Sequence, residues 1–383
     1  MDSLEKFATE KLLELETQHL RRWLVETDRD ADAIAIRNGR RLISFCCNDY
    51  LNLSQHPEVK RAANAATQTF GAGAGASRLV SGNHALYRKL ETALARLKGT
   101  EDSCVFGSGY LANLGIIPAL AGAGDLILAD ALSHACLMAG GKLSGAQTLT
   151  FRHNDMAHLD ELLRIHRKQY RHCMILTDGV FSMDGDLAPV RELAALAREH
   201  DAWLMTDDAH GVGVMGDGRG SSFMDGDKAD VPLQMGTLSK AVGVYGGYLC
   251  ASRAVIDLIR TRARTLIYST GLPPGIVAAA IASLEIIARA PQLCAAPLRK
   301  AQRFTRALNL PDAQSPIVPL IIGDAARALQ LSAMLEDAGF LVTAIRPPTV
   351  PDGTARLRFT FSAAHRDADI DRLASVLHMA GLT

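Results

Sequence analysis

The feature that most constrains the fold is an alternation of short apolar runs with helix-length segments between residues 58 and 290. Most runs are bounded by glycine or aspartate, and helical patterns such as residues 190–200 separate them. Six runs have the length and composition of strands: residues 103–106, 126–129, 173–177, 203–206, 233–236 and 248–251. Apolar strands spaced by helices predict an α/β fold, with a mostly parallel sheet covered on both faces.

The length of 383 residues suits two or three domains. We expect an N-terminal helix and extended segment at 1–57, with the helix over 2–26, and a large domain at 58–290. We expect a small C-terminal α/β domain at 291–383, with a helical stretch over about 275–310 that leads into it. Its predicted elements, in chain order, are strand 317–322, helix 327–338, strand 342–345, strand 355–360 and helix 367–379.

Composition excludes several classes of function. Lys and Arg (41) balance Asp and Glu (41), so no basic field indicates a nucleic acid or an anionic membrane as partner. The most apolar stretch, 275–284, is too short for a membrane span, and the N-terminus lacks the pattern of a signal peptide. Seven cysteines without a CxxC pair favour a reducing compartment, so we expect a cytoplasmic protein. No metal site is expected, since there is no HExxH and His153 and His158 are wrongly spaced for zinc.

Three consecutive predicted strands end in residues that carry chemistry. Asp178 and Ser182 follow the first strand, Asp207 and His210 the second, and Lys240 the third. These strand ends are expected at one edge of the sheet, where open α/β sheets bind ligands. A lysine among small residues and glycines suits Schiff-base chemistry with a carbonyl. Pyridoxal phosphate combines such a lysine with an acidic partner for its ring nitrogen.

A seat for the phosphate group of this cofactor is also recognisable. Residues 103–106 predict a strand, Gly107 and Gly109 a turn, and the residues from Leu111 onward a helix. The free amide groups and the positive dipole at a helix N-terminus favour phosphate binding.

These motifs together resemble the α-oxoamine synthases, which are fold-type-I pyridoxal phosphate enzymes. The resemblance rests first on the sequence DDAHG at 207–211 and on TLSKAVGVYGG at 237–247. It extends over nearly the whole chain, and the ordered set of motifs is specific to the family. The supporting stretches are residues 47–51, 73–82, 130–135, 179–185 and 346–351.

The resemblance implies roles for the residues that would contact the cofactor. Lys240 would bind it covalently and move the substrate's α-proton, Asp207 would pair with the ring nitrogen, and His134 would stack on the ring. With His210, these are the expected catalytic residues. The other contacts would be Ser182 and His210 at the ring oxygen, and Gly109, Tyr110, Thr237 and, from the neighbouring subunit of a homodimer, Ser269 or Thr270 at the phosphate.

The same resemblance implies the substrate contacts and the reaction. Asn48 and Arg346 would hold the carboxylate of an amino acid, which a guanidinium can bind through two hydrogen bonds. Arg21, Ser77 and Thr349 would face an acyl thioester, and His134 would also contact substrate. The reaction implied is a Claisen condensation of the two substrates with loss of thiol and CO₂.

Residues 344–358 are most similar to family members that join L-alanine to a pimeloyl thioester in biotin biosynthesis. The alternative is the member type that uses glycine and acetyl-CoA. Asp178 stands where the former often carry a glutamate. Whether the pimeloyl group arrives on CoA or on an acyl carrier protein is left open by the sequence.

Two alternative functions lie outside this family. A non-catalytic binding protein with the same fold would not need Lys240, Asp207 and His210 together. A nicotinamide-dependent oxidoreductase would place its glycine turn after a strand, whereas the glycines at 71–75 follow the helical pattern of residues 59–70. Both alternatives are therefore less favoured than a pyridoxal phosphate enzyme.

Overall fold

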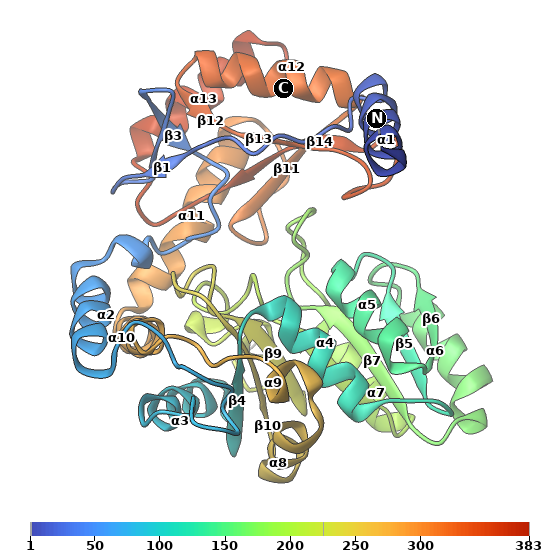
Figure 1. Ribbon diagram of the computed structural model, residues 1–383. Helices are drawn as coiled ribbons and strands as arrows, with labels where there is room; N and C mark the ends of the chain where they lie inside the picture. The colour runs from blue at the N-terminus through green and yellow to red at the C-terminus, as the bar shows by residue number, and fades with distance from the viewer. Residues whose placement is uncertain (1, 225, 383) are drawn as a thin grey trace.

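The computed structural model describes residues 2–224 and 226–382, and its centre is a seven-stranded sheet (Figure 1). All neighbours pair in parallel except that β10 runs antiparallel to both β9 and β4. The mostly parallel sheet predicted from the sequence is thus confirmed. Its strands, in spatial order, are β4 (Asp102–Phe106), β10 (Gly247–Ala251), β9 (Leu233–Thr237), β8 (Trp203–Asp207), β7 (Cys173–Asp178), β5 (Leu126–Asp130) and β6 (Gln147–Phe151).

All six strands predicted for this sheet are present, but the seventh, β6, was not predicted. It is an edge strand, paired only with β5, and only Phe151 of its five residues is buried. Its sequence alternates polar and apolar residues and so lacks the continuous apolar run that marks a strand buried on both faces.

Helices cover both faces of the sheet. Successive residues of β5 point to opposite sides, with Ile127 and Ala129 in one apolar cluster and Leu126 and Leu128 in another. The helices on the first face are α4 (Gly109–Leu120), α5 (Ala135–Ser144) and α8 (Arg253–Arg262), and those on the second are α2 (Pro57–Phe70), α3 (Leu86–Lys98), α6 (Met156–His166), α7 (Val190–Glu199) and α10 (Pro274–Arg289).

The C-terminal residues form a second α/β unit around an antiparallel three-stranded sheet. Its core is rich in buried aromatic side chains, among them Phe304, Phe359 and Phe361. The predicted strands and helices of this region are all present. They are β11 (Ile317–Gly323), β13 (Thr343–Ile345) and β14 (Ala355–Thr360), with helices α11 (Pro291–Ala307), α12 (Ala325–Asp337) and α13 (Asp367–Met379).

The N-terminal extended segment pairs with this C-terminal unit (Figure 1). Strands β1 (Asp28–Arg29), β2 (Ile34–Arg37) and β3 (Arg40–Ser44) are antiparallel, and β12 (Phe340–Leu341) adds to β3 in parallel. Sequence patterns cannot reveal such a pairing, because its two strands lie about 300 residues apart and one has only two residues.

The N-terminal helix is shorter than predicted. The pattern predicts a helix over residues 2–26, but α1 spans Ser3–Thr17, and the chain turns at His19, whose φ is 57°. None of the α1 side chains is buried, so no core favours further helical turns.

The helical stretch predicted over about 275–310 is two helices, α10 and α11, bent by 81°. Pro291 begins α11, where its missing N–H disrupts no hydrogen bond of that helix. Across the described residues, no single helix is long and apolar enough to span a membrane; this bent pair meets the length and composition only when its two halves are counted together.

A buried ion pair fixes the segment after β8. Lys98, the last residue of α3, has its Nζ 2.6 Å from Asp208 Oδ2 and 2.6 Å from the carbonyl oxygen of Arg219, and both charged side chains are fully buried. Asp208 also accepts a hydrogen bond from the Ser221 N–H. A Cβ at Gly220 would lie 1.9 Å from Asp208 Oδ2, so only glycine leaves room for this carboxylate.

We predict that Asp208→Asn lowers the free energy of unfolding by about 3–5 kcal/mol, because it leaves the Lys98 ammonium buried without its counter-charge. Urea unfolding followed by circular dichroism measures the change. Asp217→Asn, which breaks an exposed 3.9 Å ion pair with Arg219, is the control and should cost less than about 1 kcal/mol. Equal effects of the two substitutions would contradict the prediction.

Candidate active site

A cavity of about 220 Å³ lies at the carboxyl ends of β7, β8 and β9. Its lining comes from loops that follow strands and from the start of α4, as expected for a ligand site in an α/β sheet. The predicted cofactor and catalytic residues that line it are Gly109, Tyr110, His134, Ser182, Asp207, His210, Thr237 and Lys240.

Asp207 is the last residue of β8 and is held by two N–H donors. Its Oδ1 accepts a hydrogen bond from the Ala209 amide at 3.0 Å, and its Oδ2 accepts one from Asn113 Nδ2 at 2.7 Å. Asp178 lies opposite Asp207 on β7, and burial, followed by the nearby negative charge of Asp207, raises its pKa well above the usual value. Burial thus favours the uncharged form of Asp178, whereas each carboxylate oxygen of Asp207 has an N–H donor.

Lys240 lies beside two other titratable side chains. Its Nζ is 2.7 Å from His210 Nε2, and the hydroxyl of Tyr50 is 2.7 Å from His210 Nδ1. Burial lowers the pKa of Lys240 to about 8, since it disfavours the ammonium form. It also lowers the pKa of His210 well below its usual value and raises that of Tyr50 to about 12. Lys240 is thus available as a free amine slightly above neutral pH, as a nucleophile requires.

The start of α4 forms a seat for an anion. The Ser108 hydroxyl caps the helix by accepting a hydrogen bond from the Leu111 amide. The first N–H groups of a helix have no partner within it and favour phosphate. Glycine at 109 keeps this turn close to β9, because a Cβ there would lie 3.2 Å from the Cβ of Thr237. The Thr237 hydroxyl is 2.8 Å from that of Ser239.

His134 caps α5 at the edge of the cavity. Its Nδ1 accepts a hydrogen bond from the Cys136 amide at 3.2 Å, and burial lowers its pKa, so the ring is neutral. The cavity thus offers a free amine, a carboxylate, a flat neutral ring and an amide seat. This set of groups fits pyridoxal phosphate.

Apart from His134, the predicted substrate residues lie outside this cavity. Arg346 donates a hydrogen bond to the carbonyl of His19 and, with Arg21, lines a cavity of about 430 Å³ near β13. Thr349 lines a third cavity, of about 820 Å³, which meets the first at Ser182. Asn48 accepts a hydrogen bond from Arg358 at 3.2 Å. These substrate roles stay predictions.

Ser269 and Thr270, expected from a neighbouring subunit, also lie away from the cavity of this chain. Thr270 is exposed and forms a β-bridge with Ser77. Their role at the phosphate also stays a prediction.

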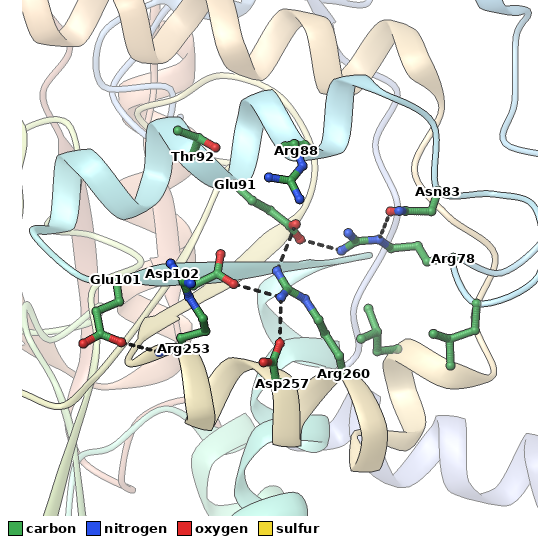
Figure 2. Close-up of a pocket in the computed structure, with 12 residues that line it drawn as sticks. Arg78, Asn83, Arg88, Glu91, Thr92, Glu101, Asp102, Arg253, Asp257 and Arg260 are labelled. Atoms are coloured by element: carbon green, nitrogen blue, oxygen red, sulfur yellow. Dashed lines mark hydrogen bonds and ion pairs between the residues drawn. The ribbon is translucent and has the colours of Figure 1, made fainter.

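A polar cavity of about 590 Å³ lies elsewhere, between α3 and α8 (Figure 2). There Glu91 accepts hydrogen bonds from Arg78 at 2.7 Å and from Arg260 at 3.3 Å. Because Glu91 is buried and also accepts from the Val105 amide, this network ties the loop at 71–83 to β4. Its charges largely satisfy one another, which indicates a structural role.

Three residues around the cofactor cavity were missed by the sequence reasoning. Tyr50 contacts His210, Arg358 contacts Asn48 and the Ser182 carbonyl, and Asn113 contacts Asp207. Asn113 had a usable signal, since it is a polar residue in the otherwise apolar helix GYLANLGIIPAL.

Comparison with known proteins agrees with this geometry. The family of aminotransferases of class I and II matches residues 40–377. The chain belongs to this family. It is a fold-type-I enzyme, and its cofactor is pyridoxal phosphate, as the sequence predicted.

Curated relatives cover almost the whole chain. An 8-amino-7-oxononanoate synthase of Methylocella silvestris is 65% identical over 342 residues, 89% of this chain and 97% of the relative. One of Maricaulis maris is 60% identical over 375 residues, 98% of this chain and 96% of the relative.

Two solved structures extend the comparison. A serine palmitoyltransferase from S. paucimobilis with bound PLP–myriocin matches with a TM-score of 0.93 at 30% identity, covering 100% of this chain and 98% of that one. An 8-amino-7-oxononanoate synthase from Francisella tularensis matches with a TM-score of 0.75 at 28% identity, covering 89% and 98%.

We predict that pyridoxal phosphate added to cofactor-free protein attaches to Lys240 with a rate that rises with pH around a midpoint near 8. Below that pH Lys240 is protonated, and above it the amine is free, whereas ordinary lysines stay protonated to about pH 10. Borohydride trapping and peptide mapping measure the adduct, and Lys240→Ala, which should fold normally, is the control. An adduct on another lysine, or a midpoint near 10.5, would show the prediction to be wrong.

Proposed function

We propose that the protein is an 8-amino-7-oxononanoate synthase, which condenses L-alanine with a pimeloyl thioester and releases thiol and CO₂ in biotin biosynthesis. The observation that carries this proposal is the meeting of Lys240, Asp207, His134 and the start of α4 around one cavity. Whole-chain identities of 57–69% to proteins of that name support the choice of reaction.

Pyridoxal phosphate, when bound, supplies an electron sink for the negative charge that develops at the α-carbon of the amino acid. Asp207 would pair its carboxylate with the ring nitrogen and favour the protonated form of that nitrogen. Lys240, with its pKa near 8, accepts the α-proton on Nζ and can return it. His210 stays neutral and holds Nζ at 2.7 Å, so it orients the amine without competing for the proton.

The acid group of L-alanine would be held by Asn48 and Arg346. Arg358 donates a hydrogen bond to the Oδ1 of Asn48. The Nδ2 hydrogens of Asn48 can therefore donate to a carboxylate. The guanidinium of Arg346 donates a hydrogen bond to the His19 carbonyl, so it would have to exchange this bond for one to the substrate.

The cavity of about 820 Å³ suits the acyl chain. It meets the cofactor cavity at Ser182, and side chains such as Leu20, Leu132 and Phe181 give it apolar walls. An acetyl group would leave most of this space unfilled, which favours a pimeloyl thioester over the alternative of glycine with acetyl-CoA.

We also propose a cytoplasmic homodimer in which Ser269 or Thr270 of one subunit completes the phosphate seat of the other. The exposure of Thr270 and Tyr268 in the single chain supports this arrangement. The acyl carrier would be CoA or an acyl carrier protein.

We predict that the holoenzyme releases thiol fastest with L-alanine and pimeloyl-CoA when L-alanine and glycine are crossed with pimeloyl-CoA and acetyl-CoA. Burying several further methylene groups, at about 0.8 kcal/mol each, should favour pimeloyl-CoA by at least about 100-fold in kcat/KM. A preference for glycine with acetyl-CoA would overturn the proposed reaction and leave the cofactor chemistry intact.

We predict that Asp207→Asn lowers kcat by about 100-fold with a much smaller change in KM, because the charge that Asp207 stabilises develops mainly in the transition state. Steady-state thiol release measures both constants. Asp178→Asn is the matched control on the neighbouring strand, and because burial favours the uncharged form of Asp178 its effect on kcat should be far smaller. A near-normal kcat for Asp207→Asn would remove Asp207 from its role.

A further inference from the structure

Asn113 lies one helical turn after Gly109 on α4 and is fully buried. Both hydrogens of its amide group have acceptors on other elements. Nδ2 donates to Asp207 Oδ2 at 2.7 Å and to Cys136 Sγ at 3.0 Å. One side chain therefore links the end of β8 with the start of α5.

The other half of this amide is unsatisfied. Asn113 Oδ1 is buried and has no hydrogen-bond partner among the residues described. The reverse orientation of the amide would bring Oδ1 against the carboxylate of Asp207, so the observed orientation is the favourable one. A buried carbonyl without a partner costs stability that an apolar side chain of similar size would not. This cost points to a role for Asn113 other than stabilising the fold.

Cys136 in turn contacts His134. Its Sγ lies 2.8 Å from His134 Nδ1, which also accepts the Cys136 N–H. Burial raises the pKa of the Cys136 thiol to about 12, so it keeps its hydrogen. Because Asn113 donates to the sulfur, the thiol hydrogen is left to point at Nδ1. With two donors directed at it, Nδ1 carries no proton, and the ring proton is on Nε2.

We propose that Asn113 is a positioning residue whose single amide group fixes the carboxylate of Asp207 and, through Cys136, holds His134 in the tautomer protonated on Nε2. The inference rests on the proposed contacts of Asp207 and His134 with the cofactor. Since α4 also supplies the amides of the phosphate seat, this one helix would align the phosphate, the ring nitrogen and the ring face.

The first test compares Asn113→Leu with Gln234→Met in the holoenzyme. Gln234 is a matched control, because it is a fully buried amide whose Nε2 donates to the Lys98 carbonyl and whose Oε1 also has no partner in the part of the chain that the structure describes. We expect Asn113→Leu to lower kcat about tenfold, with KM within about twofold and an unfolding midpoint no lower than that of Gln234→Met. We expect Gln234→Met to keep the kcat of the parent enzyme.

The second test reads the tautomer directly. In protein labelled with ¹⁵N-histidine, the His134 signals, identified by their loss in His134→Gln, report which ring nitrogen carries the proton. Cys136→Ala should change this pattern, and Cys136→Ser, which keeps a donor and an acceptor, should restore it. Asn113→Leu should alter the His134 signals as well.

Unchanged His134 signals in both Asn113→Leu and Cys136→Ala would overturn the inference. So would a fall in kcat that Gln234→Met shares, since it would indicate a general packing effect. If Asn113→Leu does not fold, the His134 signals of Cys136→Ala and Cys136→Ser decide whether the inference holds. A parent enzyme that binds pyridoxal phosphate but releases no thiol would refute the proposed function, while the His134 signals would still test this inference.

Discussion

The geometry of the cofactor cavity depends on one buried ion pair, that of Lys98 with Asp208. Asp208 directly follows Asp207 in the chain. The ion pair that holds Asp208 therefore also sets where β8 ends and where the carboxylate of Asp207 points. The pair has no access to water, and neither charge can be left alone there without a large loss of stability. A chemically unreactive ion pair behind the sheet edge is thus the anchor for the reactive residues in front of it.

Much of the fold was predictable because it follows from local patterns of apolar and polar residues in the sequence. Each buried strand of the central sheet is an apolar run, and the parallel order of such strands brings Asp207, His210 and Lys240 to one edge. The strand β6 and the end of α1 were not predicted correctly. An exposed edge strand and a helix without buried residues have no clear pattern of apolar residues in the sequence.

The candidate site was predictable to the extent that its residues belong to motifs. His134 and Lys240 stand in such motifs and line the cavity. Asn113, Tyr50 and Arg358 come from three distant parts of the chain, and the side chains that they contact depend on the tertiary fold, which a local pattern does not encode. Arg346 also stands in a motif; its substrate contact stays a prediction, and in this chain its guanidinium donates a hydrogen bond to the His19 carbonyl.

The parallel pairing of β3 with β12 has a consequence for folding during synthesis on the ribosome. While the chain is being translated, the N-terminal hairpin leaves the ribosome long before residues 340–341 exist. At about 5–20 residues per second, the edge of β3 waits roughly 15–60 s for its partner. During that interval an unpaired strand edge is open to pairing with other nascent chains. Its shortness and its arginines, Arg40 and Arg41, would protect it until synthesis is nearly complete.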